Sequence, residues 1–487
     1  MVFSDLFFLY LFLPLFMLCY AVARQLDPIV HREPAEGKKS FFPSVTSPVS
    51  NGVLIVFSLF FYAWGEPAYI FLMLISIVVN YIVGGFIDRG KRKSKPALIV
   101  GLIFNIGAIF IFKYANLIAD TLNIFGGNFQ HPIEAFPIGI SFYTFQSMSY
   151  LVDVYRGEVP AQRNFFSLLL YISLFPQLIA GPIVRYTTVA DEIAERHISV
   201  DDVAEGSFRF LVGLGKKVIL ANQLSGLASQ FLDGNLSSIS TGGAWIGLIA
   251  YTFQIYFDFS GYSDMAIGIG RCLGFHFNEN FNYPYISKTI TEFWRRWHIS
   301  LGSFFRDYVY IPLGGNRRHQ PLNIMVVWFL TGLWHGASWN FVLWGVYFGI
   351  IVMLEKYTIL KVQDKIPSLF LHLYSIFLIV FGWALFYFED FGRLGQFIGV
   401  LFGGGKTGWD YIATDALTGN LFLLLACVIC SLPISKLIKR VYNNSTSSGG
   451  AAAVLTVGKI LCAFALLFVS TVLLVGNTSN PFLYFRT

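Results

Sequence analysis

The chain has 487 residues, of which 55% are hydrophobic, 18% aromatic and only 13% charged. An average soluble domain carries about 25% charged residues, so this chain has too few to cover a water-facing surface, and lipid must cover much of it. This composition excludes a soluble enzyme, a disordered chain and a nucleic-acid binder. The formal charge of +6 does not change this, because it is concentrated in short loops rather than along one face.

Long apolar runs follow one another along the whole chain, and a helix that crosses a bilayer needs about 20 such residues. The runs lie near residues 3–23, 50–64, 67–87, 97–118, 136–152, 164–184, 207–232, 243–275, 322–354, 369–388, 419–438 and 452–475. Some are short and some could hold two elements. We therefore expect an all-α polytopic membrane protein with about 11–13 membrane-embedded helices, several of them re-entrant. The first run is too long for a signal peptide and lacks a basic segment before it, so it is predicted to be a membrane helix.

Basic loop residues predict the orientation of these helices, since cytoplasmic loops are enriched in Lys and Arg. The clusters are Arg32/Lys38/Lys39, residues 89–95, Arg156/Arg163 and Lys436/Lys439/Arg440, whereas the loop 119–135 has neither residue type. Placing the clusters inside puts the N-terminus outside. It also directs the last helix outward, so that residues 476–487 form an external tail after a flexible connection at 443–450.

The stretch 186–206 interrupts the membrane pattern with six acidic residues and one arginine. We expect cytoplasmic or interfacial helices there, within a single integral membrane domain that covers residues 1–487. The five cysteines all lie in apolar runs and do not form a disulfide framework. Cys427 and Cys430 have the spacing of a metal or redox pair, but their apolar surroundings favour plain helix packing, so no metal site is predicted.

Residues 278–319 combine many aromatic side chains with a dense set of charged and polar ones. The latter include Lys288, Glu292, Arg295, Arg296, His298, Arg306, Asp307, Asn316, Arg317, Arg318 and His319. A charged side chain at the centre of a lipid-facing helix costs about 2.5–3.5 kcal/mol on insertion scales. The segment must therefore line a polar cavity or lie along the cytoplasmic interface.

His335 is the only ionisable residue in the apolar run that follows until Glu355. A histidine inside a membrane helix is a functional hypothesis by default, although a lone buried histidine is generally more often structural. Histidine is suited to proton transfer near neutral pH, and desolvation would keep its ring neutral and able to accept a proton. His298 is the natural second member of the site; alternatively it only packs against Trp297 and Arg296 at an interface.

Several longer motifs resemble the membrane-bound O-acyltransferase (MBOAT) superfamily, in its bacterial AlgI/DltB-like branch and closest to the alginate O-acetylase (AlgI) type. The motifs are FDFSGYSDMAIG (257–268), ITEFWRRWHISL (290–301), RDYVYIPLGGNR (306–317), GLWHGASWNFVLWG (332–345), FPIGISFYTFQSMSYLVDVYRG (136–157) and FPQLIAGPIVR (175–185). The opening residues, FYAWGEP at 61–67 and FKYAN at 112–116 add to them, so the resemblance covers nearly the whole chain in order.

This resemblance implies an MBOAT fold around a central tunnel, in which a cytoplasmic thioester meets a hydroxyl acceptor that enters from the other side. The family's catalytic histidine falls on His335 and its second histidine on His298. We assign His335 as the general base and His298 as its partner or orienting group, because a hydroxyl is a poor nucleophile until a base takes its proton. No bound cofactor is expected; the donor substrate is acetyl-CoA or the thioester of an acyl carrier protein.

The other polar residues are assigned in two groups. Lys288, Arg295, Arg296 and Arg306 are candidates for binding donor phosphates, with positive-inside anchoring as the alternative. Asp258, Asp264, Asp307 and Asn316 are taken as structural polar residues, and an ion pair between Asp264 and Arg271 fits their spacing of seven residues on one helix. Residues 314–316 are predicted to form a turn rather than a phosphate-binding loop.

The C-terminal segment NPFLYF (480–485) resembles an aromatic ending found in cell-envelope members of the superfamily. By that analogy Tyr484 would accept the acyl group in the tunnel and pass it to an extracellular partner. The alternative is an interfacial aromatic anchor. The chain also departs from the usual pattern, because it ends in Thr487 rather than in an aromatic residue.

The sequence thus predicts a multi-pass enzyme of the bacterial cytoplasmic membrane that moves acetyl groups across the membrane lipid for O-acetylation of an extracellular polysaccharide, alginate-like, or of peptidoglycan. The resemblance implies a separate extracellular or periplasmic SGNH-hydrolase-like acyltransferase as its partner. Two other functions stay open: a lipid or protein acyltransferase that uses a longer acyl chain, and a transporter or polymer-export channel without chemistry of its own.

Overall fold

The computed structural model describes residues 1–30, 47–88, 94–133, 136–179, 181–434 and 449–476, and these form helices joined by turns, with no strand among them. Seven helices in this part of the chain are long and apolar enough to cross a membrane, and a bent pair, Tyr411–Gly419 with Leu421–Ser431, adds an eighth if it counts as one span. The predicted all-α polytopic fold is confirmed. The number of about 11–13 membrane-embedded helices, which includes re-entrant ones, stays a prediction.

The chain contains two compact units, each built from two stretches of sequence: residues 1–210 with 262–278, and residues 211–261 with 279–487. The boundaries fall inside helices α10 and α12. The single membrane domain expected for residues 1–487 stays a prediction.

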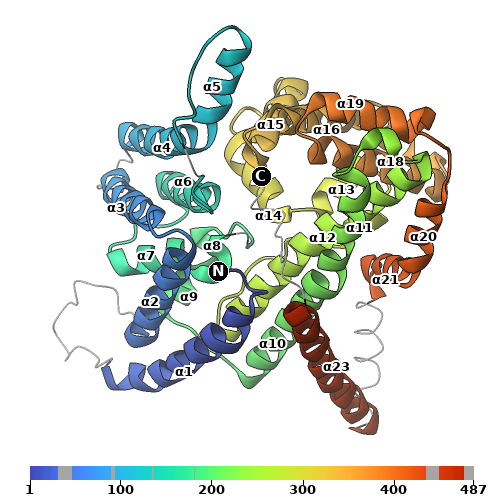
Figure 1. Ribbon diagram of the computed structural model, residues 1–487. Coiled ribbons are helices and arrows are strands. Elements are labelled where there is room, and N and C mark those ends of the chain that lie inside the picture. Colours follow the sequence, from blue (N-terminus) through green and yellow to red (C-terminus); the bar gives the residue numbers. More distant parts are fainter. Residues whose placement is uncertain (31–46, 89–93, 134–135, 180, 435–448, 477–487) are drawn as a thin grey trace. The chain divides into compact units, whose positions relative to one another are not determined.

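The first unit contains the N-terminal helices, coloured blue to teal in Figure 1. They are α1 (Leu13–Val30, after a π-helical turn Phe8–Phe12), α2 (Pro48–Gly65), α3 (Tyr69–Ile87), α4 (Lys95–Ile109, continued by Phe110–Tyr114 into α5, Ala115–Ile124), α6 (Ile140–Arg156), α7 (Phe165–Ser173), α8 (Phe175–Leu178) and α9 (Tyr186–Ala194). The unit also holds most of α10 (Val200–Gly215) and the end of α12 (Thr241–Cys272).

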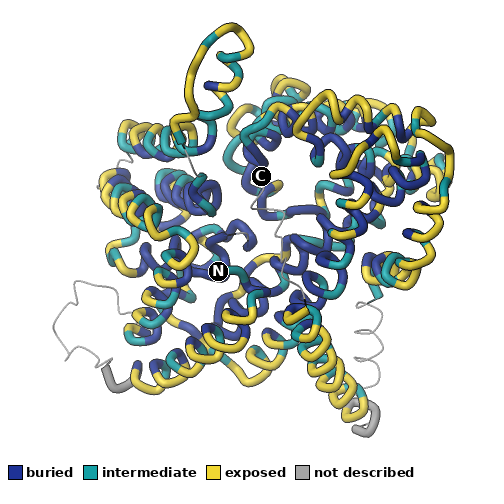
Figure 2. Tube along the Cα trace, viewed as in Figure 1, coloured by how far each residue is buried: buried dark blue, intermediate teal, exposed yellow. Residues whose placement is uncertain are grey.

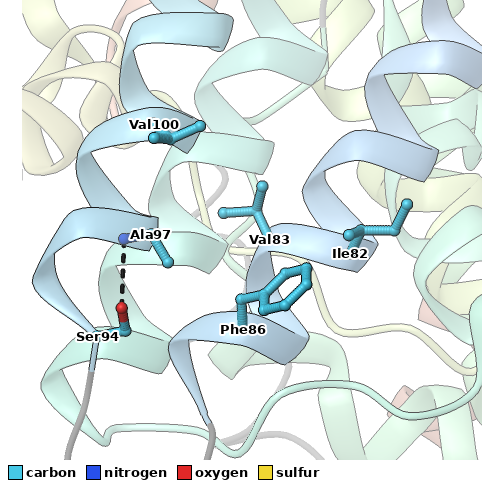
Figure 3. Close-up of a pocket in the computed structure, with 6 residues that line it drawn as sticks. All are labelled: Ile82, Val83, Phe86, Ser94, Ala97 and Val100. Atoms are coloured by element: carbon cyan, nitrogen blue, oxygen red, sulfur yellow. Dashed lines mark hydrogen bonds between the residues drawn. The ribbon is translucent and has the colours of Figure 1, made fainter.

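Helices α3 and α4 illustrate how this unit combines polar pairing inside with apolar surface outside. The side-chain amides of Asn80 and Asn105 are fully buried and hydrogen-bond to each other reciprocally, at 2.7 and 3.2 Å. On the outer side, Ile82 and Phe86 of α3 and Val100 of α4 are exposed and line a shallow apolar groove (Figure 3). Apolar side chains at such a surface suit contact with lipid tails, as expected for membrane helices.

Two ion pairs connect α10 with the end of α12 and correct one prediction. Arg271 pairs with Asp202, at 3.1 Å, and Asp264 pairs with Arg209, at 2.8 Å. The predicted pair between Asp264 and Arg271 within one helix is therefore wrong. Asp202 of α10 thus pairs with a cation of α12, and Arg209 of α10 pairs with an anion of α12. The structural role assigned to Asp264 stays a prediction.

The second unit contains the rest of the chain. Its elements are the π-helical turn Lys216–Ala221, α11 (Asn222–Leu232), the first part of α12, α13 (Ile290–Arg296), α14 (Ile299–Phe305) with its π-helical extension Arg306–Tyr310, α15 (Gln320–His335), α16 (Trp339–Tyr357), α17 (Ile359–Val362), α18 (Ser368–Tyr387), α19 (Phe391–Gly399, continued by Val400–Gly404), α20 (Tyr411–Gly419), α21 (Leu421–Ser431) and α23 (Gly449–Gly476). Short 3-10 turns lie at Leu236–Ser238, Pro284–Ile286 and Gln363–Lys365.

The core of this unit is aromatic, with Trp344, Trp383 and Phe257 among the largest fully buried side chains. The last helix, α23, is exposed along most of its length (Figure 2), and only 11% of its most apolar 18-residue stretch is buried. Lys217 and Asp258 form an ion pair at 2.6 Å, and each side chain is only 3% exposed. The sequence analysis did not foresee Lys217 as the partner of Asp258, and the structural role assigned to Asp258 stays a prediction.

Two apolar runs fold differently from a single helix. The run 164–184 breaks at Leu174 between α7 and α8, and Pro176 lies in the first turn of α8, where a helix tolerates proline because the missing N–H has no helical partner anyway. The run 322–354 divides into α15 and α16, which pack side by side (Figure 1). The break at 336–338 places His335 at the end of a helix, whereas the sequence predicted it about midway along a run.

Candidate active site

His298 lies at the elbow between α13 and α14, and polar groups hold the start of each of these two helices. Thr289 caps the start of α13 by accepting a hydrogen bond from the backbone N–H of Glu292, at 3.1 Å. The carboxylate of Glu355, on α16 and fully buried, accepts from the backbone N–H groups of Ile290 and Thr291, at 2.6 and 2.7 Å. These contacts satisfy donors that a helix start leaves free, so they fix the helix that leads into His298.

The segment around Asn280 holds the other side of the elbow. The backbone carbonyl of Asn280 accepts from the N–H of Ile299, at 3.0 Å, and its side-chain Oδ1 accepts from the N–H of Ser300, at 3.2 Å. The same Oδ1 lies 3.1 Å from Nδ1 of His298. Between these anchors His298 has a left-handed backbone, with φ of +46°. Such a conformation is strained for a residue other than glycine, and it persists only where the surroundings enforce it.

The ring of His298 is buried among neutral groups. The edge of the ring meets Phe259 of α12, with ring centroids 4.7 Å apart, and Trp334 of α15 at 5.5 Å. His298 lies outside the seven helices that could cross a membrane. Burial of its ring lowers the pKa of the imidazole to about 3. The charged form of an imidazole is disfavoured in such a setting, so the ring is neutral at physiological pH.

His335, at the end of α15, is buried with 7% exposure and surrounded edge-on by aromatic rings. Its neighbours are Trp334, Trp344 and Phe386, with ring centroids 5.0, 4.9 and 5.3 Å away. The next residue is Gly336, where a Cβ atom would overlap the ring of Phe341. Glycine is thus required for the close turn from α15 into α16 that places the imidazole in this aromatic pocket.

Trp334 connects the two histidines, because its ring contacts both His298 and His335. The two candidate catalytic residues, 37 positions apart in the sequence, therefore both contact one indole ring. Two buried imidazoles in one neighbourhood are suited to accept and return a proton. Among the described residues no cluster of three or more His, Cys, Asp or Glu side chains could hold a metal ion.

Two of the four candidate donor-binding cations form ion pairs with carboxylates of the described residues, and two do not. Arg296 forms an ion pair with Glu292, at 2.8 Å, and Arg306 pairs with the adjacent Asp307, at 2.6 Å. Lys288 and Arg295 are exposed, and their side chains form no ion pair with the described part of the chain. Arg295 lies near a further cation, Lys356 of α16. The exposed cations are therefore the stronger candidates for binding an anionic group.

Asn316 lies in the turn between α14 and α15 and connects three elements. Its Oδ1 accepts from the hydroxyl of Tyr310, the amide of Gln320 and the ammonium of Lys356, at 2.8, 2.6 and 2.8 Å. The preceding Gly314 and Gly315 both have positive φ, at +111° and +54°, which glycine tolerates best. This confirms the predicted turn, and the structural role assigned to Asn316 stays a prediction.

Two residues with central positions were missed by the sequence analysis, Asn280 and Glu355. Glu355 was visible as an isolated carboxylate at the end of an apolar run, and a buried carboxylate needs several donors around it. Asn280 gave no signal of its own.

Tyr484 and the tail predicted at 476–487 lie outside the described residues except for Gly476, so the role of Tyr484 stays a prediction. Cys427 and Cys430 lie in α21 as free thiols, as predicted.

The structure combines a helical membrane fold with a pair of buried histidines, and comparison with known proteins shows the family to which the chain belongs. Residues 156–389 match the model of the membrane-bound O-acyltransferase family, and both histidines lie inside that range. The chain belongs to this family and is an O-acyltransferase.

Three relatives show how far the similarity extends. The chain is 36% identical to the probable alginate O-acetylase AlgI of Azotobacter vinelandii, over the full length of both proteins. It is 40% identical to the protein of the same name from Pseudomonas aeruginosa, over 80% of this chain and 72% of that one. It is 34% identical to the peptidoglycan O-acetyltransferase of Helicobacter pylori, over 79% and 77% of the two chains. The predicted resemblance to the AlgI type is confirmed.

Proposed function

We propose that this protein is a membrane O-acetyltransferase that takes an acetyl group from a cytoplasmic thioester and delivers it for O-acetylation of an extracellular polysaccharide or of peptidoglycan. The observation that carries this proposal is the pair of buried histidines that share Trp334. Their surroundings suit proton transfer away from bulk water. The names of the relatives, alginate O-acetylase and peptidoglycan O-acetyltransferase, supply the class of acceptor.

In the proposed reaction the hydroxyl oxygen of the acceptor attacks the carbonyl carbon of the acetyl thioester. His335 takes the hydroxyl proton as the C–O bond forms, the C–S bond then breaks, and the proton passes to the leaving thiolate. General base catalysis of this kind contributes about 10²–10⁴-fold to the rate. Aromatic walls around His335 exclude water and so limit hydrolysis of the thioester.

Cations on the surface support a phosphate-bearing donor. Arg295 and Lys356 lie near each other, and an anion between them would relieve their mutual repulsion. The donor would be acetyl-CoA or the phosphopantetheine thioester of an acyl carrier protein, both of which carry phosphate. Arg296 and Arg306 already pair with Glu292 and Asp307, so Arg295 and Lys288 are the better assignments of the four predicted residues.

The proposal includes the orientation derived from the basic loops: a bacterial cytoplasmic membrane, both termini outside, and an SGNH-hydrolase-like acyltransferase as the external partner. The tail would then lie where Tyr484 can carry the acetyl group to that partner. Substituting Tyr484 by phenylalanine tests this step. Abolished polymer acetylation supports a covalent carrier, and unchanged acetylation overturns it.

Vesicles of defined sidedness test the proposed function as a whole. Radiolabelled acetyl-CoA is supplied on the cytoplasmic face, and label is followed into polymer on the other face for the wild-type chain and for His335→Ala. The proposal predicts labelled polymer only with the wild-type chain. A transporter without base chemistry would label the polymer equally with both, and preferential use of palmitoyl-CoA would show a long-chain acyltransferase instead.

A further inference from the structure

Of the two ring nitrogens of His298, only Nδ1 has a hydrogen-bond partner among the described residues. Nδ1 lies 3.1 Å from Oδ1 of Asn280. Nε2 is buried and has no hydrogen-bond partner among the described residues, and the residue as a whole is only 2% exposed. An unsatisfied buried polar atom destabilises the folded state. The strained φ of His298 adds a second cost at the same residue.

The side-chain amide of Asn280 can be oriented from its hydrogen bonds. The atom near His298 also lies 3.2 Å from the backbone nitrogen of Ser300 and 2.9 Å from the hydroxyl of Ser300. A backbone N–H can only donate, so the atom facing it must be the amide oxygen and not the amide nitrogen. The alternative orientation would set two donors against each other.

This orientation determines the tautomer of His298. Because the amide oxygen can only accept, the nitrogen that faces it must carry the proton. A neutral imidazole carries a single proton, so Nε2 bears a lone pair. The groups that contact the ring are Asn280, Ser300, Phe259 and Trp334, from the segment before α13, from α14, α12 and α15. None of these is titratable near neutral pH or charged, so nothing in these contacts competes with Asn280 for the choice of tautomer.

We propose that Asn280 is a positioning residue that keeps the proton of His298 on Nδ1 and thereby presents the lone pair of Nε2 to a hydroxyl of the acyl acceptor that neighbours the reacting one. The inference rests on the proposed function, and it names the atom through which His298 acts. Nε2 accepts a hydrogen bond from this neighbouring hydroxyl, which orients the acceptor for the attack on the thioester, while His335 takes the proton of the reacting hydroxyl. A lone pair on Nε2 can bind only a group with an O–H or N–H donor, so the ligand at this atom is a hydroxyl-bearing or amine-bearing acceptor.

The first test compares kinetics of the full-length protein in vesicles for three variants. Asn280→Ala removes the acceptor, and we expect turnover to fall by about 10- to 100-fold, within the range of general base effects, with little change in KM. Asn280→Asp keeps an acceptor for Nδ1–H but adds a negative charge, which favours the imidazolium. Its activity at high pH should exceed that of Asn280→Ala, and activity should decline at higher pH than in the wild type as the medium is acidified.

Ser300→Ala is the matched control. It removes another hydrogen bond to the same Oδ1 and the long contact of the Ser300 hydroxyl with Nδ1, at 3.5 Å, but leaves the contact between Oδ1 of Asn280 and Nδ1 in place. We expect its turnover to stay within about threefold of the wild type, because a neutral hydrogen bond makes only a small net contribution. If Asn280→Ala turns over like the wild type, or Asn280→Asp shows an unshifted pH profile, the inference is overturned.

A spectroscopic measurement tests the tautomer without activity. Nitrogen-15 NMR of the histidine-labelled protein, with the His298 signals assigned by their loss in His298→Gln, distinguishes protonated from unprotonated ring nitrogens. We expect a protonated Nδ1 and an unprotonated Nε2 in the wild type. A protonated Nε2 would overturn the inference. Failure of the wild type to transfer acetyl to any polymer would count instead against the proposed function.

Discussion

The carboxylate of Glu355 accepts the hydroxyl hydrogen of Thr291 at 2.6 Å, in addition to its backbone N–H at 2.7 Å. Glu355 belongs to α16, which follows the break after His335, and Thr291 belongs to α13, which leads into His298. One buried carboxylate therefore connects the helices next to both histidines. This contact ties the start of α13 to the last turn of α16.

Removing this carboxylate should loosen the site and the fold together. In Glu355→Leu two backbone N–H groups of α13 lose their acceptor inside the protein, which costs about 1–3 kcal/mol for each unsatisfied group. We expect a lower midpoint of thermal unfolding in detergent and reduced acetyl transfer. Glu355→Gln retains one acceptor oxygen and should lie between Glu355→Leu and the wild type. Equal midpoints for all three proteins would show that the contact does not stabilise α13.

The turn after His335 depends on Gly336. In Gly336→Ala the added methyl group overlaps the ring of Phe341, so α15 and α16 must separate and His335 moves within its aromatic pocket. A displacement of about 1 Å at a catalytic group can cost 10²-fold in rate. We expect Gly336→Ala to lose most of its activity, and Gly336→Ala/Phe341→Ala to recover part of it. A double variant no more active than the single one would argue against the steric explanation.

Lys217 and Asp258 form a buried pair, and this should appear in a double-mutant cycle. Lys217→Met leaves an uncompensated buried carboxylate, which destabilises a protein by about 3–5 kcal/mol. In Lys217→Met/Asp258→Leu no charge remains, and the stability should return close to that of the wild type. The measurement is the free energy of unfolding in detergent for the four proteins. Additive losses would contradict a paired, desolvated arrangement.

The buried neutral His298 should make the fold sensitive to acid. Its pKa is about 3 in the folded protein, whereas a free imidazole titrates near 6.5. As the pH falls below about 6.5 the unfolded chain binds a proton that the folded chain does not, so this contribution to stability is lost progressively toward lower pH. Between pH 8 and pH 5 the thermal midpoint of the wild type should fall more than that of His298→Gln. Parallel curves would show that His298 is not buried in its neutral form.

Much of this arrangement could be predicted from the sequence because membrane segments follow a simple rule of length and hydropathy. The apolar runs near 50–64, 67–87 and 369–388 became α2, α3 and α18 with small shifts at their ends. His335 was identified because an ionisable residue in an apolar run is costly, and His298 was added as the second member of the site from the polar stretch 278–319. The resemblance of the motifs around them was confirmed by the comparisons.

The rest depended on pairings between distant parts of the chain. Spacing within one helix predicted a partner for Asp264 in Arg271, but α10 supplies a nearer cation, Arg209. Likewise the hydrogen bonds of Asn280 to Ser300 and of Glu355 to Thr291 join separate elements, and no local pattern indicates them. The position of His335 at a helix end rather than in its middle follows from the close turn at Gly336, which hydropathy does not register.

The central claim is that His335 is the base that activates the acceptor hydroxyl. The measurement that tests it most directly is the single-turnover rate of acetyl transfer from labelled acetyl-CoA by His335→Ala in vesicles, with folding checked by the thermal midpoint. The account predicts a rate about 10²–10⁴-fold below the wild type, with the labelled donor still bound. A rate close to that of the wild type in a folded variant would contradict it.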